Sequence, residues 1–239
     1  MVAPDRKGTI LFDLDGTLLP IDIEFFLKNY LSAVGSYFKD LVDPKKMVRA
    51  IVTATQAIVD DRDPSVTNLD AFGKAFEPLI GRPWDEMWPR FMAFYRDEFP
   101  NLRRFVSSSD GARNVVERCI SAGYEIVLAT NPMFPQCAIR ERMKWCGVLD
   151  LPWRLITSME IMHFCKPNLE YYMEIVEMAR LDPESSIMVG NDINEDMVAK
   201  RLGMKTYLVE DLVIDRGGGV EPDCRGSLQD LPDFLETLT

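Results

Sequence analysis

Residues 9–17 read Thr-Ile-Leu-Phe-Asp-Leu-Asp-Gly-Thr, a short apolar run followed at once by two acids and a glycine. The apolar run is rich in β-branched and aliphatic residues, which is typical of a strand. Because residues two apart on an extended chain point the same way, Asp13 and Asp15 can converge where this strand ends. Gly16 permits the tight turn that takes the chain away from the strand.

Four more runs of this kind occur farther along the chain, each bounded by polar or turn residues. They are continuously apolar instead of alternating, as expected of strands that are covered on both faces in a parallel sheet. The predicted strands are residues 9–12, 125–129, 154–157, 187–189 and 206–209.

Helical patterns lie between the later strands. One predicted face holds Ala112, Val115, Val116, Cys119 and Ile120, and another holds Leu169, Tyr172, Met173, Val176 and Ala179. Strands that alternate with helices predict an α/β fold with a doubly wound, mostly parallel, Rossmann-like sheet. Such sheets bind their ligands beyond the carboxyl ends of the strands.

Residues 21–105 break this alternation, because they carry helical periodicities, one of them ended by Gly81, but no convincing strand. We therefore predict an all-helical domain at 21–105, inserted into an α/β core formed by residues 1–20 and 106–239. The insertion is rich in aromatic residues. We expect them to form its own core and its seam with the sheet.

The composition is that of a globular protein: 239 residues, of which 47% are hydrophobic and 27% charged. No apolar run approaches the roughly 20 residues that a bilayer span needs. The first eight residues lack the apolar stretch of a secretory signal. We therefore expect a cytoplasmic protein with no membrane partner.

The net charge and the cysteine content exclude further kinds of partner and site. The formal net charge of −11 repels nucleic acid phosphates, so we expect no nucleic acid partner. The five cysteines are an odd number with no Cys-x-x-Cys pair, which indicates neither a disulfide framework nor a zinc site. We expect reduced, mostly buried thiols.

Asp13 and Asp15 are too close to ionise together comfortably without a cation. A division of labour is plausible, in which ionised Asp13 is a metal ligand and nucleophile while Asp15 holds or accepts a proton. A turn or capping cluster of acids does not explain the preceding strand. A calcium-binding EF-hand loop would need glycine where Leu18 stands and a helix where the strand is predicted.

A second acidic cluster, Gly-Asn-Asp-Ile-Asn-Glu-Asp at 190–196, follows the fourth strand. Asp192 is expected just beyond the carboxyl end of this strand, near enough to share a cation with Asp13. Asp196 has two open interpretations: a metal ligand, or an acid in the first turn of a helix that is favoured by the helix dipole.

Two further segments supply groups that suit a phosphoryl group. Thr130 and Asn131 follow the second strand, and Lys166 precedes a proline and a predicted helix. Together they offer a hydroxyl, backbone N–H groups and an ammonium, which is what the transition state of phosphoryl transfer needs.

These four elements, in this order, resemble the motifs of the haloacid dehalogenase superfamily of hydrolases. The resemblance covers nearly the whole chain, through residues 13–17, Thr130, Lys166 and residues 190–196. Dehalogenase members lack an acid two residues after the first Asp, so Asp15 favours phosphate ester chemistry. The resemblance therefore implies the phosphatase branch with a helical cap, similar to phosphoglycolate phosphatase.

In that family the residue matching Asp13 is the nucleophile and the one matching Asp15 is the general acid and base. The matches to Thr130 and Lys166 hold the phosphoryl oxygens. The metal ligands correspond to the Asp13 carboxylate, the Asp15 carbonyl and Asp192. Magnesium suits such a site because it prefers about six oxygen ligands and keeps several waters.

Asn191 intervenes between Gly190 and Asp192, which leaves open whether Asp196 binds metal directly or through water. The expected activity is magnesium-dependent hydrolysis of a small phosphorylated metabolite through an aspartyl phosphate on Asp13. A phosphomutase of the same fold and a non-catalytic scaffold protein are the alternatives.

Other segments carry weaker indications. His163, the only histidine, lies near Lys166 in sequence and could touch substrate, although a lone histidine is more often packed or solvated. The glycines at 217–219 predict a surface loop. Specificity would come from the insertion near the site entrance, through Asp22, Glu24 and residues 84–88.

Overall fold

The computed structural model describes residues 7–107 and 111–238. Its centre is a sheet of six strands in the order β3-β2-β1-β4-β5-β6, and every neighbouring pair is parallel. The strands are β1 (Gly8–Phe12), β2 (Tyr124–Leu128), β3 (Leu155–Ile156), β4 (Ser186–Gly190), β5 (Lys205–Val209) and β6 (Cys224–Gly226). The predicted doubly wound parallel sheet is confirmed. Its winding changes direction at β1, where ligand sites of such sheets lie.

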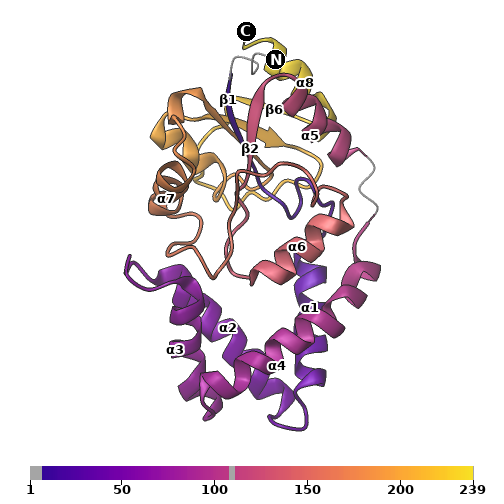
Figure 1. The fold of residues 1–239 in the computed structure, drawn as a ribbon, viewed down its shortest axis with the longest axis vertical. Helices are drawn as coiled ribbons and strands as arrows, with labels where there is room; N and C mark the ends of the chain where they lie inside the picture. Colours follow the sequence, from indigo (N-terminus) through magenta and orange to yellow (C-terminus); the bar gives the residue numbers. More distant parts are fainter. Residues whose placement is uncertain (1–6, 108–110, 239) are drawn as a thin grey trace.

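Helices cover both faces of the sheet (Figure 1), which explains why the strands are continuously apolar. Ile10 and Phe12 point into one buried cluster, whereas Leu11 between them points into another. The helices of this part of the chain are α5 (Ala112–Ser121), α6 (Gln136–Trp145), α7 (Leu169–Ala179) and α8 (Leu231–Glu236), and the short 3₁₀ helices are η2 (Pro183–Ser185), η3 (Met197–Leu202) and η4 (Leu228–Asp230).

Two details of the predicted sheet were wrong. The sixth strand, β6, was not expected, because its sequence Cys-Arg-Gly carries no apolar run and it pairs on one side only, with β5. The strand predicted at 154–157 has only two residues, Leu155 and Ile156. Short edge strands such as these bury little side-chain surface, so hydrophobic patterning detects them poorly.

The predicted buried face of α7 was also displaced. Tyr171, Tyr172 and Ile175 are buried, whereas Met173 is 53% exposed. Apolar residues occupy more than one side of this helix, so periodicity alone did not select the buried side. Tyr171 can be buried because its hydroxyl donates a hydrogen bond to the carbonyl of Thr130 at 2.9 Å.

The segment between β1 and β2 is helical, as predicted, and the described ranges contain no strand there. Its elements are α1 (Ile23–Tyr37), α2 (Pro44–Asp60), α3 (Asn68–Ile80), α4 (Trp84–Asp97) and the 3₁₀ helix η1 (Phe99–Phe105). Helix α3 ends at Gly81, whose φ of 74° requires the left-handed conformation that glycine adopts readily. The domain boundaries at 20/21 and 105/106 stay a prediction.

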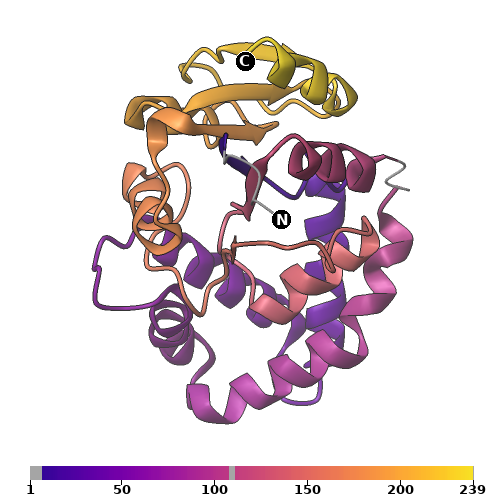
Figure 2. The ribbon, with the colours of Figure 1, turned by 45° about the horizontal axis from the view of Figure 1, so that its top comes forward.

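Figure 2 shows the helical insertion on one side of the sheet-containing part of the molecule. Aromatic contacts join the two: the Tyr30 ring lies 5.1 Å from that of Phe134, and Phe99 stacks on Trp145 at 5.4 Å. The buried cluster that contains Ile10 and Phe12 extends into the insertion. The expected aromatic seam is therefore present.

The structure also bears on the predictions for the cysteines, for the glycines at 217–219 and for membrane spans. All five cysteines are free, and three of them are buried. Residues 217–219 lie in a loop, as expected. Across the described ranges, the helices are too short or too polar for any of them to cross a bilayer.

Candidate active site

The site lies where β1, β2 and β4 end side by side. Phe12 is in register with Leu128 on one side and with Val189 on the other. The Asp13 N–H donates to the Val189 carbonyl at 2.9 Å, so the pairing continues one residue beyond β1. This register brings Asp13 next to the segments that follow β2 and β4.

Lys166 joins two of the predicted site acids. Its Nζ lies 2.8 Å from Oδ1 of Asp13 and 2.6 Å from Oδ1 of Asp196. The side chains of Lys166 and Asp196 are each 1% exposed. Lys166 is thus a buried ammonium held between two carboxylates, and not a surface lysine.

The electrostatics of this trio follow from burial and charge. Burial by itself would lower the pKa of Lys166, but the carboxylates of Asp13 and Asp196 raise it well above its usual range. Burial raises the pKa of Asp196, an effect that Lys166 opposes and Asp13 supports. An anionic group brought beside Asp13 would find its nearest positive charge on Lys166.

Asp196 is not an exposed acid at a helix terminus. It stands at the N-cap position of η3, and its Oδ2 accepts the backbone N–H of Asp192 at 2.9 Å. A Cβ at Gly190 would lie 2.1 Å from this same oxygen, so only glycine fits there. Asp196 therefore ties the end of β4 to Lys166, and a direct metal contact stays a prediction.

Thr17 and Asn191 complete the contacts around Asp13. The Thr17 hydroxyl lies 3.4 Å from Oδ2 of Asp13 and 3.1 Å from Oδ1 of Asn191. A Cβ on Gly16, whose φ is 85°, would lie 2.2 Å from Nδ2 of Asn191. The tight turn predicted at Gly16 is present, and it allows this side chain to approach the loop after β1.

Asp15 forms an ion pair with Arg142, which the sequence analysis did not identify. The Arg142 side chain is 1% exposed, and its guanidinium lies over the Phe134 ring at 4.5 Å. Burial raises the pKa of Asp15, while Arg142 opposes and Asp13 supports this shift. Oδ1 of Asp15 and Nη2 of Arg142 are buried without a hydrogen-bond partner within the described ranges.

One signal in the sequence could have found Arg142. It lies in α6, four and three residues after the buried Ala138 and Ile139, and so on the same face. An arginine on the apolar face of a helix must be paired, because an unpaired buried charge is costly. Hydrophobic periodicity uses apolar residues alone, so it did not identify Arg142.

Asp192 lies just beyond β4, as predicted, and both of its carboxylate oxygens have partners. Oδ1 accepts the backbone N–H groups of Asn194 and Glu195 at 2.9 and 3.0 Å. Oδ2 accepts a hydrogen bond from Nη1 of Arg216 at 2.7 Å, and the Arg216 side chain is 55% exposed. A half-exposed guanidinium thus occupies one side of this carboxylate.

Thr130 and Asn131 follow β2 and lie beside Lys166 and the loop after β4. Nδ2 of Asn131 donates to Oε2 of Glu195 at 3.0 Å, and it also lies 3.5 Å from the Lys166 carbonyl. Thr130 is buried, and its carbonyl accepts hydrogen bonds from the hydroxyls of Tyr171 and Thr157. These bonds fix the backbone after β2 next to the Asp13 trio.

The weaker candidates lie elsewhere or serve local structure. Nδ1 of His163 pairs with Oε1 of Glu174 on α7 at 2.6 Å. Asp22 caps α1 by accepting the Phe25 N–H at 3.0 Å. Glu24 is exposed in the first turn of α1. The structure assigns none of these three a contact with the Asp13 trio.

The oxygen donors of the site can be compared with the needs of a divalent cation. Within residues 7–107 and 111–238, no three His, Cys, Asp or Glu side chains lie close enough together to hold a metal. Magnesium needs only one or two carboxylates, with waters and substrate oxygens completing its shell. Asp13 and Asp192 supply hard carboxylate oxygens, and the guanidinium on Asp192 shows that this acid attracts a cation. The residues therefore fit magnesium.

Comparison with protein families identifies the chain. Residues 10–209 match the model of haloacid dehalogenase-like hydrolases. The chain belongs to this family. The match spans the four sequence elements on which the resemblance rested, and it makes the protein a hydrolase of the haloacid dehalogenase type.

Individual relatives of this haloacid dehalogenase-like chain are distant. Pyrophosphatase PpaX of Bacillus cereus is 22% identical over 204 residues, which cover 85% of this chain and 83% of the relative. A haloacid dehalogenase-type phosphatase from Thermococcus onnurineus superposes with a TM-score of 0.61 at 19% identity, covering 95% and 97% of the two chains. L-2-haloacid dehalogenase from Xanthobacter autotrophicus gives 0.59 at 14% identity, covering 97% and 99%. These structural similarities establish the fold.

Proposed function

We propose that this protein is a magnesium-dependent phosphohydrolase that transfers the phosphoryl group of a small phosphomonoester to Asp13 and then to water. One observation carries the proposal: Asp13 and Asp15 leave the same strand, yet they lie in different electrostatic settings. Asp13 contacts the ammonium of Lys166, whereas burial raises the pKa of Asp15. Two acids with separated environments suit the separate roles of nucleophile and proton donor.

In the first step, a carboxylate oxygen of Asp13 attacks phosphorus in line with the ester oxygen. The bond between phosphorus and the ester oxygen breaks, and protonated Asp15 gives its proton to the departing alkoxide. Lys166 contacts Asp13 at 2.8 Å, so it stands beside the phosphoryl oxygens as they gain charge. The Thr130 hydroxyl and the backbone N–H groups after β2 are the further donors.

In the second step, water attacks the phosphorus of the aspartyl phosphate. Asp15, now ionised, takes the proton of this water, the bond between phosphorus and Asp13 breaks, and inorganic phosphate leaves. Arg142 pairs with Asp15 and favours the ionised form, which this step requires. Burial favours the protonated form of Asp15, and the Arg142 guanidinium favours the ionised form. A group that acts first as an acid and then as a base must adopt both forms.

Magnesium, held by the carboxylates of Asp13 and Asp192 with the Asp15 carbonyl, would neutralise the charge that the phosphoryl group brings. Among the protein's own groups, the ammonium of Lys166 also neutralises part of the charge of the phosphoryl group. The unpartnered buried atoms near the site, Oδ1 of Asp15 and Oδ1 of Asn131, are suited to a ligand or ordered water.

The structural relatives include both a phosphatase and a dehalogenase. Asp15 supports the phosphatase assignment, because displacement of a halide needs no proton donor for the leaving group. A phosphomutase would return the phosphoryl group to a second substrate hydroxyl. The distant likeness to pyrophosphatase PpaX supports a phosphoanhydride as a second candidate substrate.

The test uses Asp15→Asn with magnesium and p-nitrophenyl phosphate, whose leaving group departs readily without a proton. We expect a burst of nitrophenol approaching one equivalent per site, then slow turnover, because the variant cannot deprotonate the attacking water. Mass spectrometry after an acid quench should find the phosphoryl group on Asp13.

An alkyl phosphate provides the internal control for this test, because its basic leaving group depends on the proton of Asp15. The burst should be absent or very slow with it. Equal losses with both esters and no labelled Asp13 would contradict the proposal. No turnover of any phosphomonoester by the parent enzyme would support the scaffold alternative.

A further inference from the structure

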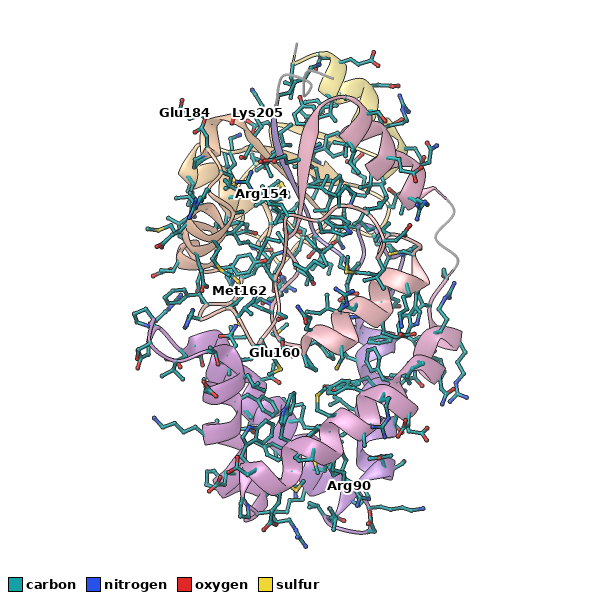
Figure 3. All side chains as sticks on the ribbon, viewed as in Figure 1. Arg90, Arg154, Glu160, Met162, Glu184 and Lys205 are labelled. Atoms are coloured by element: carbon teal, nitrogen blue, oxygen red, sulfur yellow. The ribbon has the colours of Figure 1, made fainter. Side chains whose placement is uncertain are left out.

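A cavity of about 270 Å³ lies between the helical insertion and the loops that follow β2 and β3. We call it the cap cavity. Side chains of α1, α2, α3 and α4 form most of its wall, and Met133, Phe134 and Met159 close it on the side of the sheet. Figure 3 labels Glu160, which follows the wall residue Met159, between the sheet-containing part and the helical insertion.

The lining of the cap cavity is mostly apolar, apart from Thr55, Gln56 and the hydroxyls of Tyr30 and Tyr95. No Asp, Glu, Lys, Arg or His is among the described residues that form its wall. The hydroxyls of Tyr30 and Tyr95 lie 2.7 Å apart and bond to one another, so they are already satisfied. Burial raises the pKa of Tyr30 to about 12, which keeps this phenol neutral. A charged group placed here would lose its hydration without gaining a partner.

The wall is also rich in rings: Tyr30, Phe72, Trp84, Trp88, Phe91, Tyr95 and Phe134. Aromatic faces and edges favour a second flat ring, and the two methionines can adapt to its outline. An engineered protein cavity of roughly 150 Å³ accommodates benzene. The cap cavity is therefore large enough for a bicyclic aromatic group or a short alkyl chain.

Two buried side chains, Phe134 and Arg142, lie between the cap cavity and Asp15. Phe134 lines the cavity, and its ring carries the guanidinium of Arg142 at 4.5 Å. Arg142 in turn pairs with Asp15. Along the chain, Met133 begins the cavity wall three residues after Thr130, and its N–H donates to the Asn131 carbonyl at 2.8 Å. The cavity thus lies on the Asp15 side of the site.

We propose that the cap cavity binds the apolar body of the leaving group, so that the preferred substrates are aryl or alkyl phosphomonoesters. This inference rests on the proposed function, in which Asp15 protonates the leaving group. A leaving group that meets Asp15 lies next to Arg142 and Phe134, and its carbon skeleton extends past them into the cavity. Polar, multiply anionic leaving groups find no complementary charge there.

The experiment compares 2-naphthyl phosphate with phenyl phosphate, whose leaving groups have similar basicity, so the ratio of kcat/KM reports contact with the extra ring. We expect the parent enzyme to favour the naphthyl ester about tenfold or more, since even one methylene in a hydrophobic pocket changes specificity about tenfold. The isothermal titration of 2-naphthol measures the cavity alone, without any reaction.

Thr55→Phe places a ring in the cavity, because Thr55 lines it from α2. Thr53→Phe is the matched control: the same change, two residues away on the same helix, at an exposed side chain that does not line the cavity. We expect Thr55→Phe to lower the naphthyl preference and the affinity for 2-naphthol about tenfold each, and Thr53→Phe to leave both unchanged. If Thr55→Phe does not fold, Val52→Phe serves, since Val52 lines the cavity and is 52% exposed.

Three outcomes would contradict one or both proposals, and they are distinguishable. Hydrolysis of both esters at equal kcat/KM, unchanged by Thr55→Phe, overturns this inference and leaves the proposed function intact. Binding of 2-naphthol that Thr55→Phe abolishes, in an enzyme that hydrolyses no phosphomonoester, overturns the proposed function and the leaving-group assignment with it. Equal 2-naphthol affinity of the parent and Thr55→Phe shows that the cavity does not take an aromatic ligand.

Discussion

The strand-end site and the cap cavity adjoin one another, but charged side chains form the site and mostly apolar side chains line the cavity. In the site, every predicted acid has a cationic partner: Lys166 for Asp13 and Asp196, Arg142 for Asp15, and Arg216 for Asp192. In the cap cavity, the described wall carries no charge, and its two tyrosine hydroxyls bond to each other.

This difference separates two tasks. Charge compensation acts on the phosphoryl group, which all phosphomonoesters share, whereas apolar contact acts on the leaving group, which differs among them. Changes at Asp13, Lys166 and Asp192, which act on the phosphoryl group, should therefore affect all substrates alike. Changes in the cavity should affect the choice between substrates. Four predictions, in order of decreasing effect, test the charged half of this division.

The largest effect is expected for Asp13→Asn, because a neutral amide cannot attack phosphorus as the carboxylate does. Turnover of every ester that the parent hydrolyses should fall at least about a thousandfold, measured as phosphate release. Binding of 2-naphthol should be unchanged in a titration. Asp40→Asn is a control, since Asp40 pairs with Arg90 in the insertion, away from the site (Figure 3). Residual turnover within tenfold of the parent would exclude Asp13 as the nucleophile.

Lys166→Met should lower turnover about a hundredfold, since a donor to the transferring group is lost. It should also lower the free energy of unfolding by about 3–5 kcal/mol, because Asp13 and Asp196 remain buried without their counter-charge. Urea denaturation measures the second effect. Adding Asp196→Asn should restore part of the stability but none of the rate. Recovery of both together would show that Lys166 acts through folding alone.

Arg142→Leu should lower the free energy of unfolding by about 3 kcal/mol, because Asp15 loses the partner of a buried ion pair. The same change in an Asp15→Asn background should cost at least about 1 kcal/mol less, since no carboxylate is left unpaired. Arg118→Leu, at an exposed pair with Asp233, is the control and should leave stability almost unchanged. Additive losses in the double variant would argue against direct coupling of Arg142 to Asp15.

The smallest effect is expected for Arg216→Gln. Removal of the guanidinium from Oδ2 of Asp192 should tighten magnesium binding about two- to fivefold, the range that a partly exposed ion pair allows. Titration calorimetry with magnesium alone measures this. Arg225→Gln is the matched control, because that arginine is similarly exposed and pairs with Glu210 and Glu221. Weaker magnesium binding by Arg216→Gln would mean that Arg216 supports the metal site instead of competing for it.

Much of the architecture was accessible from local pattern. Strands buried on both faces leave a continuous apolar run, so β1, β2, β4 and β5 were predicted to within one residue at each end. Of the edge strands, β6 was not predicted, and β3 is shorter than the predicted residues 154–157, because little of their surface is covered. The helical insertion was predicted because its periodicity repeats over several turns. Outside the insertion, the buried side of α7 was not predicted correctly.

The site shows the same division between local and distant information. Asp13, Thr130 and Asp192 could be predicted as neighbours because the carboxyl ends of adjacent parallel strands meet at one edge. The burial of Lys166 and its ion pair with Asp196 could not be predicted. Both depend on how the loop after β3 packs against the loop after β4. Nor could the pairing of Arg142 with Asp15, which are 127 residues apart in sequence.

What the sequence by itself determined was the fold class, the insertion and the set of acids at the strand ends, because each of these follows from the order and spacing of neighbouring residues. Only the tertiary structure decided the counter-charge of each acid and the existence of the cap cavity. Ion pairs between distant helices and the space left between packed rings depend on side-chain directions in three dimensions. Hydrophobic periodicity does not contain that information, because it records which side of an element is apolar and not what that side meets.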